Sequence, residues 1–258
     1  MAATARSGPY AAPRCSGPNW PKKSSITASS AAVASYGTSS ARARSQPWTT
    51  SSSIATTATR SSSRDALLDA AVAVVRTRGL HATTVDDLCA TAGVSKGAFF
   101  HHFASKEDLA IAAAHHWSVT TGGLFADAPY HEADEPADRV LGYIDFRASI
   151  IGDAIDQYTC LVGTMVQEAY VTNPAIRDAC AASILGHAAT LEADIAEALM
   201  AAGTDVPDVA ADAASLARHT QVVLQGAFVV SKAANDPAVA LDSVRHLRRY
   251  FEFLFHRT

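Results

Sequence analysis

The chain has 258 residues, of which 48% are hydrophobic and 18% charged, and its formal net charge at pH 7 is −4. A chain of this length can bury the core of one or two domains. Its apolar runs are too short to cross a bilayer, and its polar N-terminus lacks the hydrophobic stretch of a secretory signal. These features argue against a membrane protein and lead us to expect a globular protein of the cytoplasm.

Charge and composition divide the chain near residue 63. Residues 1–63 carry a net charge of +7 with no acidic residue, whereas residues 64–258 carry −11. Ser, Ala and Thr dominate the first segment, so we expect residues 1–63 to form a disordered basic tail. Three interpretations of this tail stay open: an attractant for phosphates, a targeting peptide, or translation assigned from an upstream start.

A short helix is predicted directly after Thr84. Thr84 and Asp87 have the spacing of a capping box, in which the hydroxyl accepts from a backbone N–H and the carboxylate accepts in return. Gly93 can adopt the left-handed conformation that ends a helix sharply. The apolar positions of this helix share one face: Val85, Leu88 and Cys89.

Two more helices are predicted after the glycine turn. Ser95 caps a helix over Lys96–His102, and Ser105 with Asp108 caps the next one. A short helix held across another is the arrangement that places protein in the major groove of DNA. Spacing alone fits a helix-turn-helix and an ordinary helix pair equally well. The local charge does not decide between them, because residues 64–115 hold five basic and six acidic residues.

Residues 64–116 resemble the DNA-binding domain of the TetR family of transcriptional repressors. The resemblance is carried, in order, by a first helix over Asp65–Arg78, Gly79-Leu80, Thr83-Thr84-Val85, Ala92-Gly93-Val94-Ser95-Lys96-Gly97, His102-Phe103 and Ser105-Lys106-Glu107-Asp108-Leu109. It implies that Lys96, Gly97 and Ala98 face bases. It further implies that Thr84 and Lys106 hold phosphates.

One residue departs from this family pattern. Phe100 stands where the family usually has a tyrosine whose hydroxyl binds a phosphate, so this contact is lost or moves to His101. Helix starts and nearby side chains could supply the other contacts to the DNA backbone. The expected DNA-binding residues are Thr84, Ser95, Lys96, Gly97, Ala98, Phe100, His101, His102 and Lys106.

The rest of the chain has helical spacing, so we predict an all-α fold. A helix-turn-helix domain over 64–116 is followed by a helical ligand-binding and dimerisation domain over 117–258. Gly122-Gly123 and residues 129–135 are predicted to separate helices. Prolines at first helical positions and a glycine at a helix end support the other boundaries. The third motif helix extends to about Thr121, and later helices are predicted over 136–157, 158–171, 174–202, 207–234 and 237–257.

The resemblance also implies a small effector bound among the middle helices. Aromatic and polar side chains gather there, although each of them also fits an ordinary core. The segment from Cys160 to Glu168 resembles one that lines the ligand cavity in part of the family, and Gly163 and Thr164 keep that helix thin. The expected ligand-binding residues are Trp117, Phe125, Tyr143, Phe146, Cys160, Gly163, Thr164, Met165, Gln167 and His187.

Apolar stripes mark the last two predicted helices. The stripe on the final helix could close the monomer core or pair across a two-fold axis, and the resemblance favours a homodimer through both helices. One short recognition helix reads few base pairs, and a two-fold dimer doubles the site. The stripes comprise Val222, Val223, Gly226, Val229 and Val230, then Val244, Leu247, Tyr250, Phe251, Leu254 and Phe255.

Catalytic and metal-binding spacings are not recognisable, so we expect no enzyme and no cofactor. Cys15, Cys89, Cys160 and Cys180 fit neither a zinc site nor a disulfide framework, and a redox sensor formed by the last two is the minor interpretation. We expect a ligand-responsive transcriptional repressor that binds a palindromic double-stranded DNA operator as a homodimer. The alternative is a helical small-molecule-binding or thiol-sensing protein without DNA binding.

Overall fold

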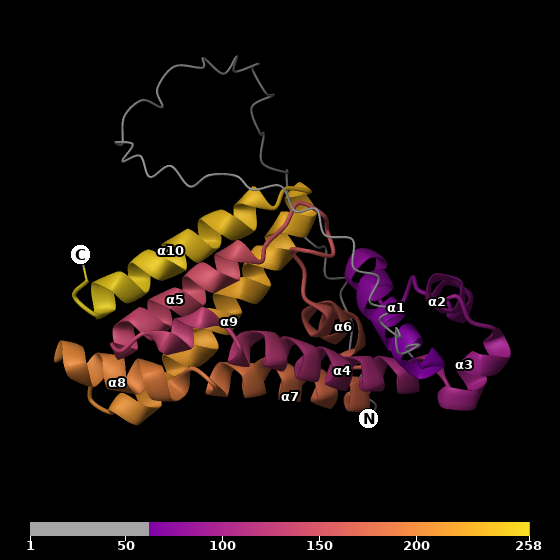
Figure 1. Cartoon of the computed structure of the whole chain (residues 1–258), viewed down its shortest axis with the longest axis horizontal. Helices are drawn as coiled ribbons and strands as arrows, with labels where there is room; N and C mark the ends of the chain where they lie inside the picture. The colour runs from indigo at the N-terminus through magenta and orange to yellow at the C-terminus, as the bar shows by residue number, and fades with distance from the viewer. Residues whose placement is uncertain (1–61, 258) are drawn as a thin grey trace, which may run out of the picture. The chain divides into compact units, whose positions relative to one another are not determined.

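The computed structural model of the chain describes residues 62–257, and the regular secondary structure of this part is entirely helical (Figure 1). The all-α prediction is therefore confirmed. The predicted disordered tail covers residues 1–63, of which residues 1–61, with Cys15, lie outside the described residues. Its last two residues were wrongly assigned, because Ser63 begins the first helix and the Ser62 side chain caps it.

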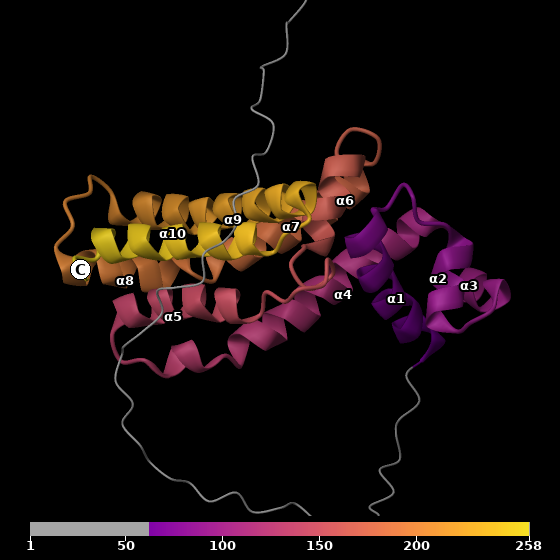
Figure 2. The ribbon, with the colours of Figure 1, turned by 90° about the horizontal axis from the view of Figure 1, so that it is seen from above.

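Three short helices gather at one end of the described part (Figures 1 and 2). They are α1 (Ser63–Arg78), α2 (Val85–Ala92) and α3 (Lys96–His102). The predicted bounds of α2 and α3 are confirmed, because Thr84 and Ser95 cap them as the sequence indicates. These helices share one apolar cluster with later ones; its fully buried members include Leu67, Leu88, Phe99, Leu109, Leu161, Met165 and Ile176.

Helix α4 (Lys106–Ala126) leads away from this end and is longer than predicted. We expected it to stop near Thr121, before the glycine pair, but it continues through both glycines. Phe125 in its last turn is buried in the C-terminal core, and this packing overrides the weak helix propensity of glycine. The predicted break over 129–135 contains a short 3₁₀ helix, η1 (Pro129–Glu132).

The following helices differ from the prediction at two places. Helix α5 (Pro136–Ser149) ends eight residues before the predicted residue 157, and α6 (Leu161–Ala169) begins after residue 158. Tyr158 and Thr159 are buried in the intervening segment, and the carbonyl of Thr159 accepts hydrogen bonds from α1. Tertiary contacts therefore hold residues 150–160 in an irregular path.

The single helix predicted over 174–202 is two helices, α7 (Pro174–Ala189) and α8 (Glu192–Ala202). At the break, the Thr190 hydroxyl donates to the carbonyl of His187, a local bond that competes with the helical pattern. Leu191 at the same break is buried in the core.

The last two helices, α9 (Val209–Ala234) and α10 (Ala238–Leu254), lie side by side and pack with α5 and α8. Figure 2 shows this pairing, and α7 adds to it through α9. Their core is built around Tyr143, Ile195, Leu224 and Phe251. The predicted domain boundary at residue 116 falls inside α4, which has residues in both apolar clusters.

Candidate nucleic-acid interface and ligand cavity

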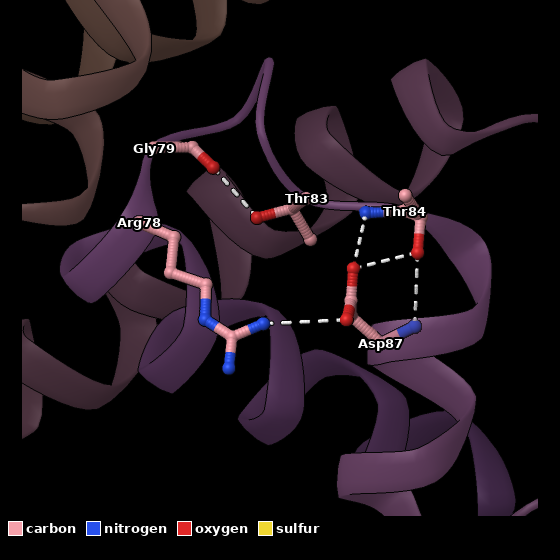
Figure 3. Close-up of polar contacts among 5 residues, drawn as sticks. All are labelled: Arg78, Gly79, Thr83, Thr84 and Asp87. Atoms are coloured by element: carbon pink, nitrogen blue, oxygen red, sulfur yellow. Dashed lines mark hydrogen bonds and ion pairs between the residues drawn. The ribbon is translucent and has the colours of Figure 1, made fainter.

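Helix α2 begins with a complete capping box (Figure 3). The Thr84 hydroxyl accepts from the N–H of Asp87 at 3.1 Å, and the Asp87 carboxylate accepts from the Thr84 N–H at 2.9 Å and from its hydroxyl at 2.6 Å. These bonds from Thr84, with smaller help from Arg78, lower the pKa of Asp87. Thr84 is exposed, yet its polar groups already serve the cap, so phosphate binding by Thr84 stays a prediction.

Helix α3 turns its amino end outward. The Ser95 hydroxyl accepts from the Ala98 N–H at 3.2 Å, and the Phe99 side chain is completely buried against α1 and α2. Because Phe99 anchors one face, the opposite face is presented to solvent. The exposed residues on α3 are Lys96, Gly97, Phe100 and His101.

Lys96 pairs with an acid of the preceding helix. Its Nζ lies 2.8 Å from Oδ1 of Asp86, and both side chains are more than half exposed. Hydrogen bonding to Asp86 raises the pKa of Lys96, so the lysine is charged at neutral pH. An exposed pair of this kind is weak and can exchange for a phosphate or a base edge.

Some aromatic side chains of α3 are exposed to solvent, and others contact the rest of the protein. Phe100, the departure from the family pattern, is 58% exposed and packs edge-on against Phe99. His101 is exposed beside it, where the displaced phosphate contact was expected. His102 instead lies half-buried with its Nε2 2.6 Å from the Ser63 hydroxyl on α1. The predicted DNA contact of His102 therefore competes with a contact inside the fold.

Lys106 has a structural role that the sequence did not indicate. Its Nζ donates to the carbonyls of Leu80 at 3.0 Å and Thr83 at 2.9 Å, so the first turn of α4 holds the loop between α1 and α2. The Thr83 hydroxyl binds the carbonyl of Gly79 within the same loop (Figure 3). Lys106 thus positions Thr84, and its own phosphate contact stays a prediction.

We expect Lys106→Met to lower the free energy of unfolding by about 2 kcal/mol, because two carbonyls lose a charged donor. Urea denaturation followed by circular dichroism measures this difference. Lys96→Met is the matched control, since it removes an exposed lysine that holds no carbonyl and should leave stability nearly unchanged. Equal effects of the two variants would contradict the structural role of Lys106.

A cavity of about 860 Å³ lies among α1, α4, α5, α7, α9 and the segment before α6. This volume is in the range of sites that hold small organic molecules. Four of the predicted ligand-binding residues line it directly: Trp117, Phe125, Cys160 and His187.

Tyr143 supports the cavity wall from behind. Its side chain is buried, and its hydroxyl lies 3.0 Å from Nε2 of His187. The same hydroxyl accepts from Nε of Arg147 at 2.9 Å and from the Gln221 amide at 3.3 Å. Burial, with the nearby Arg147 charge, lowers the pKa of His187 to about 3, so the imidazole is neutral at physiological pH.

The other predicted ligand-binding residues lie elsewhere. Phe146 packs edge-on against Phe125 and does not line the cavity. Met165 is completely buried in the apolar cluster that includes α1–α3. A smaller adjoining cavity of about 240 Å³ is lined by the three remaining predicted residues, Gly163, Thr164 and Gln167.

Two arginines at the main cavity were missed by sequence reasoning. Arg76 of α1 donates from Nε and Nη2 to the carbonyl of Thr159 at 3.0 and 2.7 Å, and its guanidinium lies 4.8 Å from the centre of the Trp117 ring. Burial lowers the pKa of Arg76. Arg147 lies 4.1 Å above the Phe125 ring. The only sequence signal for Arg147 is its place four residues after Tyr143, on the same helix face.

Glu168 of α6 is a second link to the DNA-binding segment. Its Oε2 accepts from the backbone N–H of His81 at 2.6 Å, in the loop between α1 and α2. Gly79 lies beneath this carboxylate at a φ of +89°. Glu168 therefore contacts the segment that precedes α2.

Two of the cysteines, Cys89 and Cys180, give little support to thiol sensing. Cys180 is completely buried, and burial raises its pKa to about 12. Burial also raises the pKa of Cys89. Thiols that stay protonated are poor nucleophiles, so neither group has the character of a reactive sensor.

The apolar residues predicted to form the dimer interface fall into two groups, one packed in the monomer core and one exposed. On α10 the stripe residues Val244, Leu247, Phe251 and Phe255 are buried in the monomer core. Val223 and Leu254 are half-buried and pack against the same core, whereas the remaining members are exposed, together with two apolar residues that we had not included. The exposed apolar residues of these two helices are Val222, Val229, Val230, Leu241, Tyr250 and Phe253.

Within residues 62–257, no helix has the length and apolar character needed to cross a membrane. The same part of the chain contains no cluster of three His, Cys, Asp or Glu side chains placed to hold a metal ion.

Two family sequence models match the chain. The family described as "Bacterial regulatory proteins, tetR family" matches residues 67–113. The family described as "Transcriptional regulator LmrA/YxaF-like, C-terminal domain" matches residues 136–246. The first match contains α2 and α3 completely, and the second runs from the start of α5 into α10.

Curated relatives match a short part of the chain. The HTH-type transcriptional repressor KstR2 of Mycobacterium tuberculosis is 50% identical over 48 residues, which are 19% of this chain and 24% of that repressor. KstR2 of Rhodococcus jostii is 45% identical over 53 residues, covering 20% of this chain and 26% of the relative. The chain thus matches about a quarter of the length of these relatives.

Solved structures have the same fold over most of their length. The regulatory protein TetR from Rhodobacter sphaeroides superposes with a TM-score of 0.64 at 21% identity, over 73% of this chain and 98% of that one. A TetR family regulator from Agrobacterium tumefaciens gives 0.62 at 20% identity, over 73% and 97%.

Proposed function

The chain belongs to the TetR family of bacterial regulators, and from this premise we propose that it is a ligand-responsive transcriptional repressor. One observation carries the proposal: α3 presents Lys96 and Gly97 outward while Phe99 fixes the helix from behind. This is the geometry that a recognition helix needs to approach base edges. We propose that it acts in the cytoplasm and performs no catalysis.

Contacts with DNA would be of two kinds. The exposed amino end of α3 would lie in the major groove, where Gly97 lets the backbone approach and Lys96 can reach a guanine edge. The start of α2 and the surface around His101 would bind phosphates, which fix position but carry no sequence information. Phe100 adds an apolar surface that can contact a thymine methyl group.

A homodimer is proposed for the DNA-bound form. Its interface would form from the exposed apolar residues of α9 and α10 named above, since a large apolar surface left in water is unfavourable. Two-fold symmetry would place two copies of α3 about 34–36 Å apart, in successive major grooves. A palindromic operator follows from that symmetry.

The main cavity is the proposed effector site. Arg76 connects the cavity wall at Thr159 to α1, and Glu168 connects α6 to the loop before α2. A ligand that fits only one arrangement of residues 150–169 would therefore favour one position of the DNA-binding helices. The ligand would change DNA affinity by its difference in affinity for the two arrangements.

The test of DNA binding is selection of bound duplexes from a random pool by the full chain, followed by binding assays on the selected sequence. We expect enrichment of a palindrome and an affinity that falls with salt, because bound phosphates release counterions. Failure to enrich any duplex would overturn the repressor proposal and favour a ligand-binding protein that does not bind DNA.

Lys96→Gln should weaken binding to the selected duplex and reduce sequence preference beneath the amino end of α3. The reason is that a base-edge contact carries discrimination, typically worth about 1–3 kcal/mol per base pair. Anisotropy titrations against the selected duplex and single-base variants measure it. Arg218→Gln removes a charge from an exposed residue of α9 and serves as the control. An equal loss in both variants would reduce Lys96 to a general electrostatic role.

A further inference from the structure

The basic residues around the two cavities lack acidic partners. Arg76, Arg147 and Lys232 are half-buried, yet none has a carboxylate within 4.0 Å among residues 62–257. Arg139, also half-buried on α5, contrasts with them because it pairs with Asp194 at 2.7 Å and with a second carboxylate. Asp156 attracts Arg76 and Glu168 attracts Lys232 from farther away. A half-buried cation without a close counter-charge is still unfavourable, so the missing close partners need an explanation.

A general shortage of acids does not explain this pattern, because residues 64–258 have a net charge of −11. Asp156 is the single acidic residue that lines the main cavity among the described residues, and it forms no ion pair within 4.0 Å. The cavity therefore carries positive charge inside a protein part that is strongly negative.

The hydrogen bonds around Tyr143 determine which nearby N–H groups are left without an acceptor. Its hydroxyl oxygen accepts from Arg147 and from Gln221, so its own hydrogen is available for Nε2 of His187. The neutral His187 then carries its hydrogen on Nδ1. Neither Nδ1 of His187 nor the two Nη groups of Arg147 has a hydrogen-bond partner within residues 62–257. The unused groups on both residues are N–H donors.

Apolar surface surrounds these donors. The guanidinium of Arg147 lies over the Phe125 ring, and the same space is lined by Trp117, Leu224 and Phe228. Guanidinium groups bind carboxylates and related oxyanions through parallel hydrogen bonds, more strongly where water is excluded. A ligand that is complementary to this cavity wall needs negatively charged acceptor oxygens at one end, for the N–H donors, and apolar surface over the rest.

Resting on the proposed effector role of this cavity, we propose that its ligand is an amphipathic organic anion whose acid group binds the Nη atoms of Arg147. An aromatic or aliphatic body would lie along Trp117 and Phe228. The shared chemistry is an oxyanion on an apolar skeleton, whether carboxylate, sulfonate or phosphate ester.

A matched pair of fluorescent probes tests this preference on the full chain without DNA. Anilinonaphthalene sulfonate carries an acid group, and N-phenylnaphthylamine has the same aromatic skeleton without it. Both become fluorescent in apolar sites. We expect the sulfonate to bind at least about tenfold more tightly, the usual worth of a hydrogen bond to a charged group. Equal affinity for the two probes would overturn the proposal.

Variants of Arg147 assign the preference to this residue. Arg147→Gln should weaken the sulfonate about tenfold and leave the neutral probe unchanged, while Arg147→Lys should retain part of the preference. Arg218→Gln, which removes an exposed charge from α9, should change neither probe. A preference that survives Arg147→Gln, or equal loss of both probes in every folded Arg147 variant, would overturn the assignment.

The outcome is separable from the repressor proposal. If duplex selection fails while the sulfonate preference depends on Arg147, the chain is an anion-binding protein and not a DNA-binding regulator. If duplexes are selected but both probes bind equally, the regulator stands and the anion proposal falls. Thermal denaturation of each variant, monitored by circular dichroism, establishes that the proteins compared are folded.

Discussion

Gly97→Glu is expected to weaken binding to the selected operator by at least about 100-fold while the protein stays folded. Gly97 lies exposed in the first turn of α3, and a Cβ there would meet only the Ser95 hydroxyl, at 3.6 Å. The substitution is therefore free of steric conflict within the protein. A carboxylate near a helix start is also favourable to the helix.

The loss arises at the interface with DNA. A longer side chain would keep the α3 backbone from the groove, and its charge would oppose the phosphates, a like-charge arrangement that costs several kcal/mol. In a two-fold dimer the penalty is incurred twice. Fluorescence anisotropy with a labelled duplex measures the affinity, and thermal melting establishes that the fold is retained.

Gly123→Glu is the matched control for this variant. Gly123 is also an exposed helical glycine with open space around its Cβ position, but it lies in α4, far along the chain from the recognition helix. We expect it to bind the operator with nearly wild-type affinity. If the two variants bound equally well, α3 would not be the surface that meets DNA.

Gly79→Ala is expected to lower the free energy of unfolding by about 3 kcal/mol, the second large effect. Gly79 has a φ of +89°, and a Cβ there would overlap the Glu168 carboxylate. Alanine would incur backbone strain and displace Glu168 from the N–H of His81, which would then lose a charged acceptor. Urea denaturation measures the change.

Gly203→Ala is the control for a positive φ without a side-chain overlap, although ψ differs, at 161° for Gly79 and 27° for Gly203. Gly203 also has a positive φ, +65°, but a Cβ there meets nothing within 4 Å. Left-handed backbone alone costs about 1–2 kcal/mol for alanine, so this control should lose clearly less stability than Gly79→Ala. Equal losses would mean that the Glu168 contact contributes nothing, and the proposed link between α6 and the DNA-binding segment would lose its support.

The DNA-binding segment was predictable because its signals are local. Thr84, Ser95 and Gly93 act on neighbouring backbone groups, and the bounds of α2 and α3 follow from them. The later boundaries were less predictable because distant packing decides them. The burial of Phe125 stabilises α4 beyond the Gly122-Gly123 pair, and the burial of Leu191 accompanies the break between α7 and α8.

The candidate sites show the same division. Exposure of Lys96 and Gly97 followed from the helix pattern, whereas the contacts of Lys106 and His102 depend on how α4 and α1 meet α2 and α3. In the cavity, aromatic residues could be named from composition, but the role of Arg76 could not. Its partner Thr159 lies 83 residues away in sequence, and no local pattern indicates the pair.

Arg76 also limits how freely the parts of this molecule can be exchanged. The arginine belongs to the first helix of the proposed DNA-binding segment, yet its guanidinium forms part of the cavity wall beside Trp117 and Thr159. The proposed effector site and the proposed DNA-binding segment therefore share a residue, and neither is self-contained. Selection for a different effector that altered Arg76 would at the same time alter the proposed DNA-binding segment.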